Sequence, residues 1–403
     1  MERLVIVGAS LAGLRAAQAA RREGYTGTIV LIGDEPHLPY NRPPLSKEVL
    51  AGKQQPEQTH FPLAELEADW RLGCAAVGLD REHKLVRLAD GSKVAYERLI
   101  VATGCRARRW HGTGSELLGV HSLRTLDDAI TLRAELQPGR RLVIVGAGFI
   151  GCECAASARA LGLEVTLVDI APYPMLPLGP ELGERWLRMH REQGVEVRLG
   201  AGIAALHGSD GRVNAVELSD GSRFTADLVL IGLGSELNNE WLQESGLELN
   251  PAVITDPSLT STVDPDILAA GDIAACPVPL ADGRPFRIEH WTTAGEHGQL
   301  AGRNALLEPA QRAAHTTTPY FWSDQYWLKI QAIGLPGLGE STELIEESED
   351  GQRSVLARVR AGRVVGVVAL NSAKRLMWYR KQLTSAPSLA ELKAELAQVN
   401  ERN

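Results

Sequence analysis

Short apolar runs alternate with segments of small and mixed residues along most of the chain. The runs Leu4–Val7, Thr28–Ile32 and Leu142–Val145, and a fourth that ends in Asp169, predict buried parallel strands. A helix is expected at Leu14–Arg22, between the first two strands, and a helix of small residues is expected before the fourth. This repeated order of strand, helix and strand predicts an α/β protein with two Rossmann-like sheets.

Three further apolar runs end in small residues, at Ala102-Thr103-Gly104, at Gly232-Leu233-Gly234 and at Gly271-Asp272.

The pattern changes toward the C-terminal end. Alternating apolar positions at Ser354–Arg360 and Val364–Leu370, joined by the turn 361–362, predict an antiparallel sheet, and residues 388–398 predict an amphipathic helix. A smaller α+β domain is therefore expected after the two sheets.

The segment after Leu142–Val145 has the residues of a dinucleotide-binding turn, Gly146-Ala147-Gly148-Phe149-Ile150-Gly151. Gly146 permits the tight turn, Gly148 lets the backbone approach a pyrophosphate, and Gly151 lets the helix pack on the strand. The free N–H groups of the helix N-terminus can bind the phosphates. Asp169 stands where a carboxylate binds the adenosine ribose, so a dinucleotide site is predicted here.

A second copy of this turn lies near the N-terminus, Gly8-Ala9-Ser10-Leu11-Ala12-Gly13, with Ser10 in place of the middle glycine. A small residue still allows the backbone to approach a ligand, and the spacing differs from the GxSxG of a hydrolase nucleophile elbow. Asp34 and Glu35 follow the next strand, where a ribose-binding acid belongs. Two such folds predict two dinucleotides, FAD and a nicotinamide nucleotide.

Composition narrows the class of protein. The chain has 403 residues, 44% hydrophobic and 23% charged, so two or three globular domains are expected. Its net charge of −8 argues against a general nucleic-acid binder. Met1-Glu2-Arg3 leads directly into a strand without a signal peptide, and the apolar runs are shorter than the ~20 residues of a membrane span. We expect a cytoplasmic monomer that does not enter a membrane.

The five cysteines suit a reducing compartment. Flavin disulfide reductases and NADH peroxidases need a reactive cysteine near the flavin, and the segment Pro39–Lys47 contains none. Cys152 and Cys154 flank Glu153 on a predicted helix, so they point to different faces and are expected to pack. The spacing of cysteines and histidines is not that of a zinc or iron–sulfur site, so no metal is expected. The remaining cysteines are isolated in the sequence: Cys74, Cys105 and Cys276.

Six motifs occur in order across nearly the whole chain: Gly8–Gly13, Pro43-Pro44-Leu45-Ser46-Lys47, Ala102-Thr103-Gly104, Gly146–Glu153, Ala270-Gly271-Asp272 and Phe321-Trp322-Ser323-Asp324-Gln325. Together they resemble the FAD-dependent, NADH-linked ferredoxin reductases that serve bacterial cytochromes P-450 and ring-hydroxylating dioxygenases, the family of putidaredoxin reductase and the biphenyl dioxygenase reductase. The resemblance implies a glutathione-reductase-like fold with a discontinuous FAD domain at 1–107 and 238–317. It also implies an NAD domain at 108–237 and a C-terminal domain at 318–403.

The resemblance further implies a reaction centre. Lys47 would lie beside the flavin and pair with Glu153, which would hold the nicotinamide amide during hydride transfer from NADH to tightly bound FAD; a surface lysine and a helix-surface carboxylate are the plain alternatives. A helix that follows Trp291, capped by a threonine, would point its N-terminus at the flavin. Besides this pair, the residues expected to bind FAD are Gly8, Ser10, Leu11, Ala12, Gly13, Asp34, Glu35, Arg42, Val77, Ala102, Thr103, Gly104, Arg124, Gly271, Asp272, Trp291 and Trp322, and those expected to bind NADH are Gly146, Gly148, Phe149, Ile150, Gly151, Asp169, Gly232 and Gly234.

For several of these residues a structural role is the alternative. Val77 could be a core residue, Arg124 a surface arginine, and Trp322 a core tryptophan at a domain junction. Asp169 would repel a 2′-phosphate, and Ile170–Leu176 offers no arginine to bind one, so NADH is expected over NADPH.

The implied electron acceptor is a 2Fe-2S ferredoxin that docks transiently. Basic residues at 106–109 and 374–381 could steer it. An ordinary solvated surface would explain each of these basic patches equally well. The alternatives are a rubredoxin reductase, an NADH oxidase or peroxidase, a redox-signalling flavoprotein resembling apoptosis-inducing factor, and a nucleotide-binding regulator. The missing cysteine opposes the oxidase or peroxidase, and the complete flavin set with Lys47 opposes the regulator.

Overall fold

A computed structural model describes residues 1–63 and 66–401, with side chains up to residue 399. The chain divides into two compact units. Unit 1 comprises Met1–Asn41, His60–Arg106 and Leu237–Phe321, and unit 2 comprises Arg42–Thr59, Ala107–Glu236 and Trp322–Asn403. Residues 64–65 and 402–403, which fall in the predicted FAD and C-terminal domains, lie outside the described residues.

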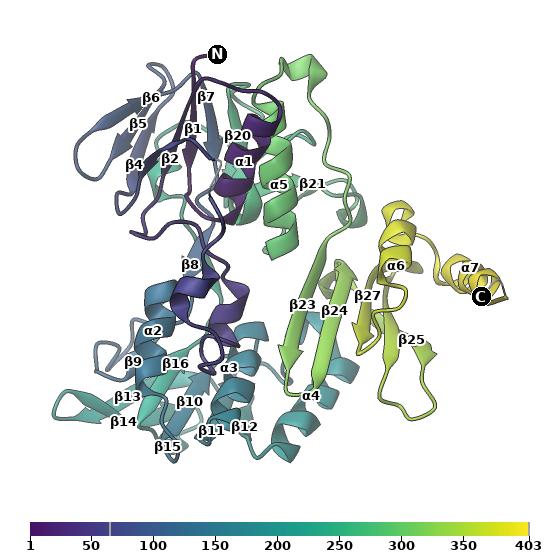
Figure 1. Ribbon diagram of the computed structural model, residues 1–403. Helices are drawn as coiled ribbons and strands as arrows, with labels where there is room; N and C mark the ends of the chain where they lie inside the picture. Colours follow the sequence, from purple (N-terminus) through teal and green to yellow (C-terminus); the bar gives the residue numbers. More distant parts are fainter. Residues whose placement is uncertain (64–65, 402–403) are drawn as a thin grey trace. The chain divides into compact units, whose positions relative to one another are not determined.

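Unit 1 is built on a parallel five-stranded sheet in the order β20-β7-β1-β2-β3. Helices α1 (Leu11–Arg22) and α5 (Trp291–Asn304) lie side by side against it (Figure 1). The two helices pack at backbone distance at Gly302 of α5. A Cβ at this position would lie 2.2 Å from the carbonyl oxygen of Ala16 in α1, so the close packing requires glycine. The strands are β1 (Arg3–Val7), β2 (Thr28–Ile32), β3 (Asp69–Arg71), β7 (Arg98–Val101) and β20 (Ile267–Ala269).

Two smaller sheets complete unit 1 and share its hydrophobic core, which joins Val5 and Val101 of the parallel sheet to Val86 and Val253. The first sheet contains β4 (Ala76–Asp80), β5 (Leu85–Leu88) and β6 (Lys93–Ala95). The second contains β18 (Leu249–Asn250), β19 (Ala252–Ile254), β21 (Ala274–Pro277) and β22 (Pro285–Arg287).

Unit 2 repeats the arrangement with a second parallel five-stranded sheet, in the order β12-β11-β10-β16-β9. A three-stranded antiparallel sheet shares its core, through Val143 and Val216 among others. The helices are α2 (Leu126–Glu135), α3 (Phe149–Ala160) and α4 (Pro180–Glu192), and the parallel strands are β9 (Val120–His121), β10 (Arg141–Val145), β11 (Glu164–Asp169), β12 (Glu196–Leu199) and β16 (Leu228–Ile231). The antiparallel strands are β13 (Ile203–Ser209), β14 (Arg212–Leu218) and β15 (Arg223–Thr225).

The C-terminal part of unit 2 contains a five-stranded sheet in the order β23-β24-β27-β26-β25. The predicted hairpin is confirmed: β26 (Ser354–Arg360) pairs antiparallel with β27 (Arg363–Leu370) around the turn Ala361-Gly362. The other elements are β24 (Leu328–Gly334), β25 (Ser341–Glu347), α6 (Leu376–Gln382) and α7 (Leu389–Glu401). The chain passes between the units after Asn41 and after Thr59, and again within β8 (Cys105–Ala107), β17 (Ser235–Leu237) and β23 (Tyr320–Gln325).

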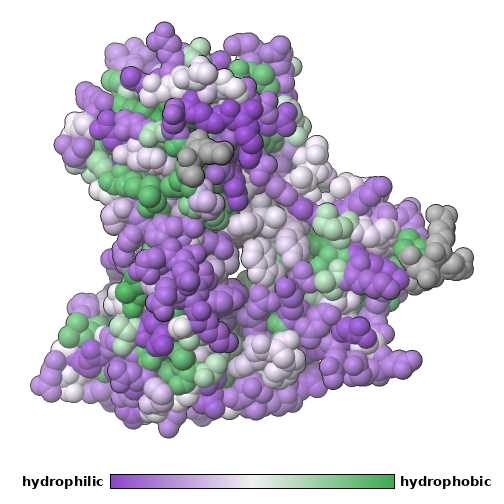
Figure 2. Space-filling view, viewed as in Figure 1, coloured by the Kyte–Doolittle hydropathy of each residue, from purple (hydrophilic) through white to green (hydrophobic). Residues whose placement is uncertain are grey.

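The surface is mixed in character. On the face drawn in Figure 2, hydrophobic residues occur in small groups among hydrophilic ones. Among the residues that the structure describes, no helix has both the length and the apolar composition needed to cross a bilayer.

Candidate functional site

The glycine-rich turn of unit 2 connects β10 to α3. Gly146 has φ +114°, and a Cβ there would lie 2.1 Å from the carbonyl oxygen of Gly232. A Cβ at Gly151 would lie 1.9 Å from the carbonyl oxygen of Gly146, so helix and strand meet here at backbone distance. Gly148 is the N-cap of α3, and within the described chain no side chain caps this helix end. Its N–H groups are therefore available to an anion.

The turn of unit 1 has the same geometry. Gly8 has φ +123°, and its Cβ would lie 2.0 Å from the carbonyl oxygen of Ala102. A Cβ at Gly13 would lie 1.9 Å from the carbonyl oxygen of Gly8. Ser10 is the N-cap of α1, but its hydroxyl makes no capping hydrogen bond to the described residues. Helix α1 begins at Leu11, earlier than predicted, so the helix end reaches the turn itself.

The acids that follow the second strand of each sheet lie near the turns. The carboxylate of Asp169, at the end of β11, accepts hydrogen bonds from the backbone N–H of Ala147 at 2.5 Å and of Ala171 at 2.8 Å. In unit 1, Asp34 is exposed after β2, whereas Glu35 is half-buried and accepts a hydrogen bond from the Tyr40 hydroxyl. These contacts hold Asp169 against its turn.

Lys47 and Glu153 form a buried ion pair within unit 2. Lys47 Nζ lies 2.6 Å from Glu153 Oε2, and the exposed fractions of the two side chains are 13% and 4%. Lys47 follows the 3₁₀ helix Pro43–Ser46 and also donates to the carbonyl oxygen of Pro43 at 3.1 Å. This geometry confirms the expected pairing. The alternatives, a surface lysine and a helix-surface carboxylate, are both wrong. The role of the pair in chemistry stays a prediction.

Three hydroxyl and amide side chains that sequence reasoning missed complete this cluster. Ser46 Oγ donates to Glu153 Oε2 at 2.5 Å, and Ser323 Oγ donates to Glu153 Oε1 at 2.6 Å. Gln325 Nε2 donates to Ser323 Oγ at 3.2 Å. The Glu153 carboxylate thus has three donors, two on Oε2 and one on Oε1, which leaves Oε1 able to accept a further hydrogen bond.

The N-terminus of α5 differs from the prediction. No threonine caps it: the N-cap is His290, and Thr292 Oγ1 instead donates to the carbonyl oxygen of Tyr320 at 2.7 Å. Burial lowers the pKa of His290 to about 4. His290 Nδ1 and Thr293 Oγ1 are buried and lack hydrogen-bond partners among the described residues. An uncapped helix end beside two unsatisfied polar atoms fits a polar ligand, because such atoms are costly to leave unpaired.

Gly271 and Asp272 lie between the N-terminal ends of α1 and α5. A Cβ at Gly271, where φ is +77°, would lie 3.2 Å from that of Ala12 and 3.5 Å from that of Ala294. Asp272 is half-buried and accepts a hydrogen bond from Cys105 Sγ at 3.2 Å. The structure thus brings the first turn, Asp272 and the start of α5 together in unit 1.

The other predicted residues have varied surroundings. Val77 is 53% exposed, so the alternative of a core residue is wrong. Trp291 Nε1 donates to Asn41 Oδ1 at 2.8 Å in unit 1. Arg42 donates to the carbonyl oxygen of Arg124 at 2.9 Å, and both residues belong to unit 2. Ala102 is buried beside Gly8, whereas Thr103, Gly104, Phe149, Gly232 and Trp322 are half-buried and Ile150 and Gly234 are exposed.

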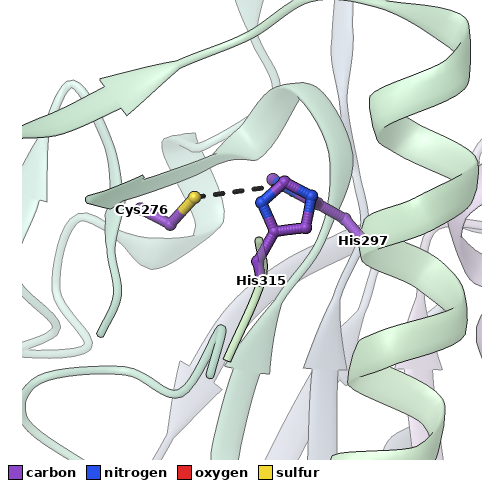
Figure 3. Close-up of side chains that lie close together, drawn as sticks. All are labelled: Cys276, His297 and His315. Carbon is purple, nitrogen blue, oxygen red and sulfur yellow. Dashed lines mark hydrogen bonds between the residues drawn. The ribbon is translucent and has the colours of Figure 1, made fainter. Parts of the chain in front are cut away.

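The two cysteines of α3 are unsuited to act as nucleophiles. Cys152 and Cys154 are fully buried, and burial raises the pKa of both thiols well above its ordinary value. Both pack, as predicted. Cys276 is isolated only in the sequence: the structure brings it to His297 and His315 in unit 1 (Figure 3).

The basic patches are partly neutralised. Arg106 contacts Glu240 at 2.5 Å, and Arg375 contacts Glu346 at 2.8 Å. Lys374 and Lys381 are exposed. The second patch therefore retains charge at its lysines, whereas Arg106 and Arg375 contribute little net field.

The chain resembles known proteins over nearly its whole length. Residues 2–298 match the family described as Pyridine nucleotide-disulphide oxidoreductase, and residues 320–400 match the one described as Reductase C-terminal. Rhodocoxin reductase of Rhodococcus erythropolis is 35% identical over 398 residues, which cover 97% of this chain and 92% of the relative. The biphenyl dioxygenase system ferredoxin–NAD(+) reductase component of Paraburkholderia xenovorans (strain LB400) is 37% identical over 385 residues, 93% and 91% of the two chains.

A solved structure agrees with these relatives. Putidaredoxin reductase, in its covalent complex with putidaredoxin, is similar at a TM-score of 0.90 with 30% sequence identity, over 96% of this chain and 93% of that one. The chain therefore belongs to the pyridine nucleotide-disulphide oxidoreductase family. Its predicted α/β fold with a smaller C-terminal domain is confirmed. The relatives' names support an NAD-linked ferredoxin reductase over the rubredoxin and signalling alternatives.

Proposed function

We propose that this chain oxidises NADH and passes the electrons one at a time to a 2Fe-2S ferredoxin of a cytochrome P-450 or ring-hydroxylating dioxygenase system, with tightly bound FAD as its cofactor. When bound, FAD supplies the conversion between two-electron and one-electron transfer. The names of the relatives support the reaction, and the two glycine-rich turns support two dinucleotides.

Unit 1 fits the FAD nucleotide. The turn at Gly8 and the uncapped start of α1 would hold the pyrophosphate. Glu35 would accept hydrogen bonds from the adenosine ribose, and Asp272 from the ribityl chain. Three observations support this assignment: the backbone contact at Gly8, the uncapped α5, and the unsatisfied atoms of His290 and Thr293. The proposed FAD domain spans 1–107 and 238–317. Within these ranges, Arg42–Thr59 folds with unit 2.

Unit 2 fits NADH. The turn at Gly146 and the start of α3 would bind its pyrophosphate. Asp169 is held beside this turn by two backbone N–H groups, and its negative charge favours ribose hydroxyls and repels a 2′-phosphate. NADH is therefore the proposed reductant. We retain 108–237 as the NAD domain and 318–403 as the C-terminal domain.

The observation that carries the proposal is the buried pair of Lys47 and Glu153. Glu153 is the fifth residue of α3, so it stands one turn beyond the helix end that would bind the nucleotide. Its Oε1 can accept a hydrogen bond from the nicotinamide carboxamide, which would orient the ring. Lys47, Ser46 and Ser323 would hold the carboxylate in place. Both members of the pair are proposed to position the reacting ring, and neither needs to transfer a proton.

The Glu153→Gln variant tests this role. The amide keeps the size of the side chain but loses the charge that holds Lys47, so we expect reduction of the bound flavin by NADH to slow roughly 100-fold through misplacement of the nicotinamide. Anaerobic stopped-flow bleaching of the flavin measures the rate. Glu164→Gln, an exposed carboxylate at the start of β11, is the matched control. Equal rates in the two variants would exclude the proposed role, and purified protein that neither contains nor takes up FAD would exclude the proposed function.

The acceptor and the assembly belong to the same proposal. A monomer that docks ferredoxin transiently suits a protein that must release its partner after each electron. The exposed lysines Lys374 and Lys381 on α6 and beside it are the proposed steering charges.

A further inference from the structure

We infer that Cys276, His297 and His315 form a metal site in unit 1 for a borderline-soft divalent cation, Zn²⁺ before others. One ligand atom from each side chain lies within 4.8 Å of the other two. Cys276 Sγ and His297 Nε2 are 3.9 Å apart. In a tetrahedral zinc site with the usual bond lengths this separation is about 3.6 Å, so only a small movement separates the observed arrangement from a bound one. Figure 3 shows the three side chains converging.

The three ligands come from separate parts of the unit. Cys276 lies in β21, His297 in the second turn of α5, and His315 in the segment between α5 and β23. Cys276 and His297 are buried, with exposed fractions of 0% and 1%. Thiolate and neutral imidazole are the ligand types that zinc prefers. A bound ion would therefore tie a strand, a helix and a loop together.

Hydrogen bonds around His315 prepare it as a ligand. The Thr317 hydroxyl donates to Glu296 Oε2 at 2.5 Å, so its oxygen must accept the hydrogen bond from His315 Nε2, 2.7 Å away. The Nε2 proton is thereby fixed, and the lone pair of His315 is on Nδ1. Carboxylate-supported histidines of this kind are typical of metal sites, because the outer partners orient the ring.

The chemistry inside the cluster also favours a cation. His297 Nε2 is the ring nitrogen that faces Cys276 Sγ, so it is the nitrogen placed to act as a ligand. The contact between Cys276 and His297 is a weak sulfur hydrogen bond, and the two histidine rings meet edge to face at 4.5 Å. Three electron-donating side chains thus converge, and these contacts between them are individually weak. His315 is the least buried of the three residues, and its hydrogen-bond partner Thr317 is exposed.

The test uses the full-length protein as purified, after removal of metal by a chelator. We expect it to take up about one equivalent of Zn²⁺ per chain, measured by elemental mass spectrometry after gel filtration. We also expect about one equivalent of Co²⁺ to bind and to absorb in the red part of the spectrum, as a tetrahedral thiolate complex does. Cys276→Ser should lose this absorption, whereas Cys74→Ser, a matched change at another free cysteine of unit 1, should keep it.

A second variant protects the test against misfolding. Thr317→Val changes an exposed residue outside the ligand set, and we expect it to weaken Zn²⁺ binding about ten-fold through loss of the support for His315. The inference is overturned if the wild type binds no more metal than Cys276→Ser, or if Cys74→Ser loses the same binding. None of these readouts depends on NADH oxidation, so this inference and the proposed function stand or fall separately.

Discussion

Glu153 and its donors come from three separate stretches of the chain. Ser46 and Lys47 belong to the segment 42–59, Glu153 lies on α3, and Ser323 lies on β23. A buried carboxylate is costly unless it is paired and hydrogen-bonded. Each donor therefore matters more than a surface contact of the same length would, since solvent cannot replace it.

The Ser323→Ala variant measures one of these donors. It removes a hydrogen bond to a buried charged group, so we expect the free energy of unfolding to fall by about 2 kcal/mol. Urea unfolding provides the measurement. Ser222→Ala is the control, because Ser222 makes an equally short hydrogen bond to Asp220 at the protein surface. Equal losses in the two variants would contradict the argument from burial.

His190 links stability to pH. It lies buried on α4, its Nδ1 is 3.0 Å from the Tyr326 hydroxyl, and burial lowers its pKa to about 4. The unfolded chain binds the proton near pH 6.5, and the folded chain binds it only near pH 4, so this stabilisation is complete above pH 6.5 and is lost as the pH falls. Between pH 7 and pH 5 we expect a loss of about 2 kcal/mol from this residue.

Urea unfolding of His190→Gln at the two pH values checks this expectation. The variant should show a smaller decrease in unfolding free energy between pH 7 and pH 5 than the wild type. His290 and His297 have pKa values lowered in the same direction by burial, so a part of the dependence should remain. His111→Gln, at an exposed histidine of unit 2, should leave the wild-type dependence intact, and an unchanged slope in His190→Gln would refute the assignment.

At the scale of elements, the turn between β10 and α3 allows the effect of a substitution on stability to be measured apart from its effect on nucleotide binding. A Cβ at Gly148 meets no described atom within 4 Å, and this residue has φ −76°, which alanine adopts readily. We expect Gly148→Ala to change the unfolding free energy by less than ~0.5 kcal/mol but to raise the KM for NADH about ten-fold, because the new methyl occupies the space for the pyrophosphate.

Steady-state kinetics with a dye acceptor and thermal unfolding distinguish the two effects. Gly146→Ala is the contrasting variant: its Cβ would meet the Gly232 carbonyl at 2.1 Å with φ +114°, so it should lose stability. An unchanged KM for NADH in Gly148→Ala would show that the pyrophosphate does not bind against this turn.

Elements with a strong pattern were predictable from the sequence, and contacts between distant segments were not. The parallel strands and both turns follow from apolar runs and glycine spacing, which act locally. The cap of α5 was mispredicted because Thr292 has a competing acceptor, the Tyr320 carbonyl, which is remote in sequence. The pair of Lys47 and Glu153 follows from the family resemblance, whereas the positions of Ser323 and of the residues around Cys276 depend on tertiary folding alone.

For the whole molecule, net charge bears on the encounter with ferredoxin. The chain carries −8, yet Lys374 and Lys381 are exposed. If local positive charge steers an acidic ferredoxin, its reduction rate should fall several-fold as salt rises from low to high ionic strength. Reduction of a small neutral dye is the control and should change little. A ferredoxin rate independent of salt would exclude electrostatic steering.

The segment 42–59 is continuous in sequence with unit 1 on both sides, yet it folds with unit 2 and carries Lys47. A fragment limited to residues 107–236 would consequently contain Glu153 without its counter-charge, because Lys47 lies on the segment 42–59. The stretch 107–236 is therefore not a self-sufficient module. Any transplant of the nicotinamide-binding part into another protein must carry three non-contiguous stretches of polypeptide together.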